Sequence, residues 1–132
     1  MSNTSGDGLR PVPISISGVP PNNATYSQAV RMGGLLFISG QLGMKAGALV
    51  EGGIREQTRQ ALDNIATILT ETGSSLDRVA KVNIFITDFS LLPQMNEVYA
   101  RYFPHCPAKT TVEITRLDKN ALIEIEVVAG AA

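Results

Sequence analysis

The sequence predicts a single α+β domain in which two amphipathic helices cover one face of a mostly antiparallel sheet. Three observations support this fold class. Two stretches place apolar residues at helical spacing, several shorter segments alternate as half-buried strands do, and a Gly-Gly pair joins two of those segments. With 132 residues, of which 44% are hydrophobic, the chain has the size and apolar content of one domain with its own core.

The chain begins with a polar stretch. Residues 1–8 are polar and rich in Gly, Ser and Asn, so residues 1–10 are predicted to form a flexible tail, which leaves residues 11–132 as the domain. The alternating segment Ile14–Ser17 predicts a strand or extended piece. The first residues lack the apolar core of a signal peptide, and no apolar run is long enough to cross a bilayer. We therefore expect a cytoplasmic protein that does not associate with membranes.

A hairpin is predicted next. Ser27–Met32 and Leu35–Ser39 are short apolar runs joined by Gly33-Gly34. Because glycine readily adopts the positive φ angles of a tight turn, the two runs are expected to pair as antiparallel strands. The glycine-rich segment Gly40–Gly53 is predicted to be a loop.

Two helices are predicted. The first covers Ile54–Thr72, because its apolar residues recur at helical spacing and Gly73 follows as a stop signal. The second begins after Asp88 or Ser90 as a capping residue and ends at Pro104. The apolar stripe expected on this second helix consists of Leu91, Met95, Val98 and Tyr102.

Three further strands complete the predicted sheet. Val79–Thr87 alternates, as do Thr110–Thr115 and Leu122–Ala129. A turn at Asp118–Asn120 is predicted to join the last two strands into a second hairpin. The side chains expected on the buried side of the first of these strands are Ala80, Val82, Ile84 and Ile86.

The opposite side of the sheet is expected to carry an unusual number of charged and polar groups. In the last two strands this side is predicted to hold Lys109, Thr111 and Glu113 together with Glu124 and Glu126. Antiparallel sheets tolerate one solvent-exposed face. Alternatively, this face packs against other copies of the chain and frames a polar pocket between them.

Lys109 and Glu124 suggest a chemistry for such a pocket. A cation and a carboxylate on neighbouring strands could hold a small carboxylic acid and move its protons. The simpler alternative is an ordinary cross-strand ion pair, which contributes little at a surface. The pattern of residues alone favours the ion pair.

The overall charge excludes other classes of function. The net charge of −1 and pI of about 5.8 disfavour binding to nucleic acid. Cys106 is the one cysteine and His105 the one histidine, so neither an internal disulfide nor a dedicated zinc site is expected. These two residues are adjacent, and neighbours in sequence rarely present both side chains to one point, so we interpret them as loop residues.

Several short segments together resemble the reactive intermediate deaminase family (Rid, or YjgF-like) and occur in the family's order. The segments are Tyr26–Val30, Phe37–Gln41, Gln57–Ile65, Asn96–Tyr99, Ala108–Glu113 and Leu122–Glu126. The resemblance implies a chorismate-mutase-like α+β fold and a homotrimer with a barrel-like core and pockets between subunits. It also implies the hydrolysis of enamines and imines of amino acids, such as 2-aminoacrylate, to 2-oxo acids and ammonia, without metal or organic cofactor.

The resemblance also assigns the pocket. The family's carboxylate-binding arginine corresponds to Lys109, and the glutamate that orients water or relays a proton corresponds to Glu124. The remaining positions that the family pattern places around the substrate are Tyr26, Ser39, Gly40, Asn96 and Thr111.

Lys109 is the main departure from the family pattern. Arginine grips a carboxylate with two parallel hydrogen bonds, whereas lysine offers one point charge on a flexible chain. The substitution favours a specialised substrate, and it leaves open a ligand-binding member of the fold with little turnover. A pocket lysine could also form a Schiff base with a carbonyl. RNA cleavage, a third activity associated with some relatives, is disfavoured because the chain lacks a basic stripe or a histidine pair.

Overall fold

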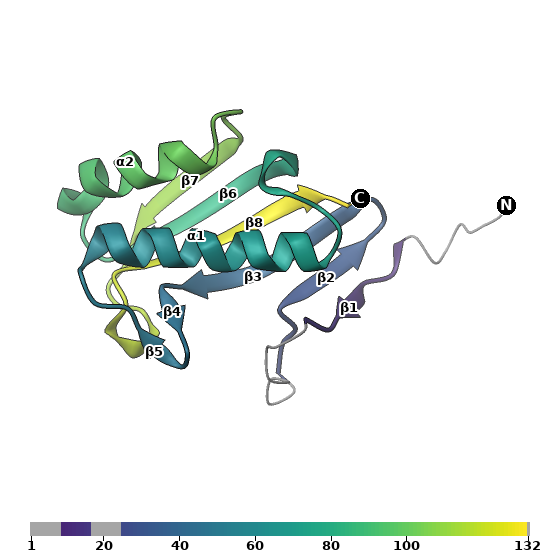
Figure 1. The fold of residues 1–132 in the computed structure, drawn as a ribbon, viewed down its shortest axis with the longest axis horizontal. Coiled ribbons are helices and arrows are strands. Elements are labelled where there is room, and N and C mark those ends of the chain that lie inside the picture. The colour runs from purple at the N-terminus through teal and green to yellow at the C-terminus, as the bar shows by residue number, and fades with distance from the viewer. Residues whose placement is uncertain (1–8, 17–24, 132) are drawn as a thin grey trace, which may run out of the picture.

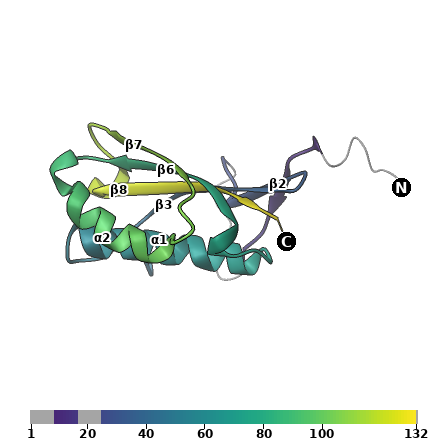
Figure 2. The same ribbon diagram turned by 90° about the horizontal axis from the view of Figure 1, so that it is seen from above.

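The computed structural model describes residues 9–16 and 25–131, and the predicted N-terminal tail lies almost entirely outside this range. The described part of the chain forms two layers. A sheet makes up one layer, and both long helices pack against the same face of it (Figures 1 and 2). Neither helix is long and apolar enough to span a membrane. The predicted α+β class is confirmed.

The main sheet has the strand order β1-β2-β3-β8-β6-β7, and all of its neighbours are antiparallel except β6 and β7. Its strands are β1 (Val12–Ile14), β2 (Ala29–Met32), β3 (Leu35–Leu42), β6 (Val79–Ile86), β7 (Ala108–Glu113) and β8 (Ile123–Gly130). The helices are α1 (Ile54–Glu71) and α2 (Leu92–Tyr102), with short 3-10 turns at Leu76–Arg78, Phe89–Leu91 and Asp118–Asn120.

The N-terminal hairpin is confirmed. β2 and β3 pair antiparallel across Gly33-Gly34, and Gly33 has a φ of 61°. Of the strand expected at Ile14–Ser17, Ile14 lies in β1, which pairs with β2, whereas Ser17 lies outside the described residues. The predicted loop Gly40–Gly53 was wrong in part, because β3 continues to Leu42 and a small separate sheet follows. That sheet pairs β4 (Met44–Lys45) with β5 (Ala48–Leu49).

The two helices bury the faces that their spacing predicts. The apolar residues that recur at helical spacing in α1 are all buried, namely Ile54, Ala61, Leu62, Ile65, Ile68 and Leu69. Gly73, with a φ of 82°, follows the end of the helix. The carboxylate of Asp88 accepts a hydrogen bond from the backbone N–H of Ser90 at 2.8 Å, so the predicted cap forms on the turn before α2. One stripe residue differs, because Tyr99 is buried on α2 and Tyr102 is only half-buried.

A bulge shifts the start of β6. Val82, Ile84 and Ile86 are fully buried under the helices, as predicted. Ala80 is exposed and Val79 is buried instead, because the pairing of β6 with β8 shifts register between Val79 and Lys81. An extra residue in one strand reverses the side to which its neighbours point.

The predicted second hairpin is wrong. β7 and β8 are not neighbours, because β8 lies between β3 and β6, and β7 pairs in parallel with β6 at the edge of the sheet. α2 forms the crossover that a parallel pair requires. The apolar alternation of β8 explains its central position, since Ile123, Ile125 and Val127 are all buried beneath the helices. The turn at Asp118–Asn120 joins the two strands without pairing them.

This topology changes which residues share a face. In the parallel pair, Lys109 lies beside Val82, and Thr111 lies beside Ile84. Since Val82 and Ile84 point toward the helices, Lys109 and Thr111 do so as well. Glu124 pairs with Phe85 on the open side of the sheet. The prediction that Lys109, Thr111 and Glu113 share a face with the β8 carboxylates is therefore wrong.

Candidate functional site

Glu124 is held on the open face of the sheet against a gap in β3. A bulge between Ile38 and Gln41 leaves Ser39 and Gly40 out of register opposite β8. A Cβ atom at Gly40 would lie 2.7 Å from Cδ of Glu124 and 2.8 Å from its Oε2. These distances are shorter than real contacts of Cβ atoms, so the missing side chain of Gly40 makes the space that the carboxylate occupies.

The surroundings of Glu124 favour its protonated form more than water does. Burial raises the pKa of its carboxyl group, and the nearby charges of Glu126 and Asp118 raise it further. Asn83 donates a hydrogen bond to Oε2 of Glu126 at 3.0 Å, so this second carboxylate already has a partner. Of the two, Glu124 is therefore the one suited to accept and return a proton.

Ser39 fixes the segment that carries Tyr26. Its hydroxyl donates to the carbonyl of Ser27 at 2.5 Å, and its backbone N–H donates to the carbonyl of Gln28 at 2.9 Å. Tyr26 precedes this anchored segment and is 57% exposed. The structure thus brings the segment of Tyr26 together with Ser39, Gly40 and Glu124 at one end of β3. We call Tyr26, Ser39, Gly40 and Glu124 the glutamate half-site.

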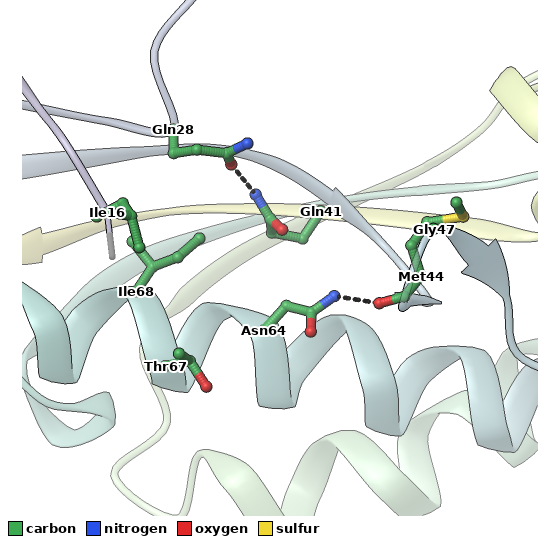
Figure 3. A pocket seen from close by; sticks show the side chains of 8 residues that line it. All are labelled: Ile16, Gln28, Gln41, Met44, Gly47, Asn64, Thr67 and Ile68. Carbon is green, nitrogen blue, oxygen red and sulfur yellow. Dashed lines mark hydrogen bonds between the residues drawn. The ribbon is translucent and has the colours of Figure 1, made fainter. Parts of the chain in front are cut away.

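A cavity of about 340 Å³ lies behind the bulge, between α1 and the end of β3 (Figure 3). Its lining residues are Ile16, Gln28, Gln41, Met44, Gly47, Asn64, Thr67 and Ile68, none of which is charged. Gln41 donates to Oε1 of Gln28 at 3.0 Å and to the carbonyl of Ser39 at 3.1 Å. Asn64 donates to the carbonyl of Met44 at 3.0 Å. Gln41 thus braces the bulge from behind, and Asn64 holds the segment that follows β3. The lining of this cavity offers no cation to an acid.

Lys109 belongs to a second group of residues on the other side of the sheet. Its Nζ lies over the ring of Tyr99 on α2, 4.5 Å from the ring centroid. Thr111 follows two positions later on the same side of β7 and is half-buried. Glu113 accepts a hydrogen bond from the backbone N–H of Phe89 at 2.8 Å. We call Lys109, Thr111 and Tyr99 the lysine half-site.

The two half-sites do not meet within one chain. Lys109 faces the helices and Glu124 faces away from them, with β6 between their strands. The ion pairs Arg55–Glu97 and Arg59–Glu56 involve neither residue, and the simple Lys109–Glu124 pair does not form between these two described side chains. Asn96 is exposed on α2, and no contact described in the structure joins it to either half-site.

The adjacent His105 and Cys106 do not act as a pair. The His105 ring nitrogen Nε2 lies 2.9 Å from the carbonyl of Val79, and the Cys106 thiol lies 3.6 Å from the carbonyl of Pro104. Both residues lie in the connection between α2 and β7, where Cys106 is exposed. Their interpretation as loop residues is confirmed.

Two features of the site were not predicted from the sequence. Tyr99 was not predicted to lie beneath Lys109, and Gly40 was not predicted to make room for Glu124. The signal for Tyr99 was its helical spacing of four residues from Met95, which places both on the buried side of α2. A bulge leaves no comparable signal, because pairing register depends on the partner strand.

The chain resembles known proteins in both sequence and fold. The sequence profile of the Endoribonuclease L-PSP family matches residues 18–131. Protein mmf2, mitochondrial, from Schizosaccharomyces pombe is 44% identical over 125 residues, 87% of this chain and 99% of that protein. A 2-iminobutanoate/2-iminopropanoate deaminase from Dermatophagoides farinae is 39% identical over 116 residues, 86% of this chain and 91% of that protein.

Solved structures agree with the fold. The Rid family protein YyfA from Yersinia pestis superposes with a TM-score of 0.86 at 41% identity and covers 92% of this chain and 100% of that one. Escherichia coli TdcF with bound serine gives a TM-score of 0.77 at 28% identity, covering 95% of each chain. Because one relative is named as mitochondrial, the cytoplasmic location stays a prediction.

Proposed function

Because the chain belongs to the Endoribonuclease L-PSP family, which includes the Rid proteins, we propose that it hydrolyses the imines and enamines of small amino acids to 2-oxo acids and ammonia. The observation that carries this proposal is Glu124, a half-buried carboxyl group with a raised pKa in the space left by Gly40. The named activity of the Dermatophagoides relative supports the reaction class.

The reaction requires little from the protein. Glu124 in its protonated form donates to the enamine carbon or imine nitrogen, which gives an iminium ion. The resulting carboxylate then takes a proton from water as the water oxygen bonds to the iminium carbon. Glu124 then gives this proton to the amine nitrogen, the C–N bond breaks as ammonia leaves, and the hydroxyl proton passes back to Glu124 while the carbon–oxygen double bond of the 2-oxo acid forms. Lys109 holds the substrate carboxylate, and Ser39 and Tyr26 border the reacting carbon.

We further propose that each site combines half-sites from two copies of the chain in a homotrimer. Lys109 and Glu124 lie on opposite faces of one sheet, so a single chain cannot bring them to one substrate. The open face also carries exposed apolar side chains, with Leu35 44%, Phe37 36% and Val112 39% exposed. An apolar patch of this kind on a sheet without a helical cover is typical of a subunit interface.

Complementation between inactive variants tests both proposals. We expect Lys109→Met and Glu124→Gln each to lose most of the hydrolysis of 2-iminobutanoate generated in situ, with semicarbazide as the competing trap. The two variants are then unfolded together and refolded in equal amounts. If each site takes Lys109 from one chain and Glu124 from its neighbour, random pairing restores both side chains at about a quarter of the interfaces.

The mixture should therefore recover about a quarter of the wild-type rate. Recovery of no activity, from mixed trimers shown to have formed, would place both groups in one chain and overturn the shared site. We expect light scattering to give about three times the 14.1 kDa chain mass. A monomer at micromolar concentration would contradict the trimer.

A second function is favoured by one observation, the lysine at position 109. A point charge orients a carboxylate less firmly than arginine does, which suits a protein that binds a small acid without turning it over. Binding of 2-oxobutanoate without any acceleration of imine hydrolysis, in wild type and in Lys109→Arg, would establish this binding function. RNA cleavage is not proposed, because the chain has a net charge of −1 and one histidine.

A further inference from the structure

We propose that Tyr99 is the positioning residue for Lys109, and that its ring fixes the ammonium group so that lysine can anchor a small monocarboxylate. This inference rests on the proposed function of the site, and it adds a residue that the family pattern did not assign to the pocket. The contact that carries it is the 4.5 Å separation between the Lys109 Nζ and the centroid of the Tyr99 ring. An ammonium within about 6 Å of an aromatic face is attracted by the negative potential of the ring.

The ring of Tyr99 is itself immobilised. Tyr99 is 8% exposed and lies on the buried side of α2, next to Met95 and Val98 in the helical stripe. Its ring packs against the ring of Phe103, with 4.9 Å between the centroids. A side chain held on both sides by the core and by a second ring cannot follow the movements of Lys109, so it acts as a fixed support.

The ring holds the cation without neutralising it. No carboxylate in the described residues forms an ion pair with Lys109, since the described pairs involve Arg55 and Arg59 instead. Glu113, the acid nearest to Lys109 along β7, already accepts the backbone N–H of Phe89. A carboxylate partner would position Lys109 equally well but would compete with the substrate. An aromatic face leaves the full positive charge available to an incoming acid.

The aromatic ring, rather than the hydroxyl group, is the functional part of Tyr99. The hydroxyl is buried and has no hydrogen-bond partner among the described residues. Burial raises the pKa of Tyr99 to about 12, so the hydroxyl stays protonated and cannot act as a base at neutral pH. This separation of ring and hydroxyl provides a matched pair of variants. Tyr99→Phe removes only the hydroxyl, and Tyr99→Leu removes the ring while keeping an apolar side chain.

The Tyr99 ring beneath the ammonium group also accounts for the use of lysine at position 109. Arginine is oriented by its own two parallel hydrogen bonds to a carboxylate, whereas the four-carbon chain of lysine leaves its single charge free to move. A ring beneath the ammonium restricts that movement before the substrate arrives, which lowers the cost of binding. The expected ligand is an acid with one compact carboxylate, and its methyl ester should not bind.

The first test observes the contact without using activity. The ε-methylene protons of a lysine above an aromatic ring are shifted upfield in the NMR spectrum by the ring current. We expect this shift at Lys109 in wild type and in Tyr99→Phe, and its loss in Tyr99→Leu. An ordinary lysine shift in the wild-type protein would overturn the proposal, whatever the protein catalyses.

The second test measures the function of the contact with 2-oxobutanoate as the probe. Tyr99→Leu should weaken its binding by about two- to fivefold, while Tyr99→Phe stays close to wild type. In a Lys109→Met background the same Tyr99→Leu change should have no further effect, because the ring acts through the lysine. Thermal unfolding verifies that each variant folds. Equal losses in the presence and absence of Lys109 would show a merely structural role and refute the inference. If 2-oxobutanoate binds with this coupling between Tyr99 and Lys109 but imines are not hydrolysed, the positioning role of Tyr99 is supported and only the proposed catalysis is rejected.

Discussion

A methyl group added at Gly40 should disable the site while leaving the fold intact. In Gly40→Ala the new Cβ atom would lie 2.7 Å from Cδ of Glu124, whereas ordinary contacts begin at 3.4 Å. The carboxyl group must therefore move by about 0.7 Å or more, or rotate away from the bulge. Because this group is the far end of a flexible side chain, it can move with little disturbance of β3 or β8.

The magnitude follows from the demands of proton transfer. A misplacement of about 1 Å at a reacting group can reduce a rate by about a hundredfold. We expect Gly40→Ala to lower kcat/KM for 2-iminobutanoate by about ten- to a hundredfold. The free energy of unfolding should change by less than about 2 kcal/mol, since overpacking at a flexible contact costs least.

Gly34→Ala provides the matched control. Nothing lies within 4 Å of a Cβ atom at Gly34, and its backbone is outside the left-handed region, so this variant should keep its activity within about twofold of wild type. Imine hydrolysis and urea unfolding should be measured on both variants and on the wild type. Activity of Gly40→Ala equal to that of Gly34→Ala would refute the reasoning that this glycine makes the space for Glu124.

Two further predictions concern stability. The pKa of Glu124 is raised above its ordinary value of 4.5, so the folded state binds the proton more tightly than the unfolded chain does. The stability that this group contributes is therefore present below pH 4.5 and is lost as the pH rises through the raised pKa. Glu124→Gln should therefore raise the melting temperature by roughly 1–3 °C at pH 7 and by less at pH 4, and an equal change at both values would contradict this titration. Gly43→Ala would place a Cβ atom 2.6 Å from the Cα of Gln57 in the rigid backbone of α1. We expect a loss of roughly 2–4 kcal/mol in urea unfolding, whereas a stability close to that of Gly34→Ala would show that α1 can move away.

Local patterns were sufficient where an element is specified by its own residues. The spacing of α1 predicted its bounds nearly to the residue, because a helix forms all its hydrogen bonds within one segment. The Gly33-Gly34 turn predicted the first hairpin for a similar reason, since the turn and both strands are adjacent in sequence. The alternation of β8 correctly separated its buried isoleucines from Glu124 and Glu126.

Strand order could not be obtained in this way. β7 and β8 are consecutive strands joined by a short connection, which favours a hairpin, yet β8 inserts between β3 and β6. The pattern of each strand records which side is buried, and it does not record which strand lies beside it. The prediction that Lys109 lies on the open face was wrong for this reason. The face to which the Lys109 side chain points depends on how β7 pairs with β6.

The sequence by itself determined the fold class, and its resemblance to a family supplied the site residues that we expect, Lys109 and Glu124 among them. Only the tertiary structure decided that Lys109 and Glu124 lie on opposite faces of one sheet and that Tyr99 supports the lysine. The physical reason is the range of the interactions. Helical spacing and turn chemistry act over a few neighbouring residues, whereas strand order and the contact of Lys109 with Tyr99 depend on how separate elements pack.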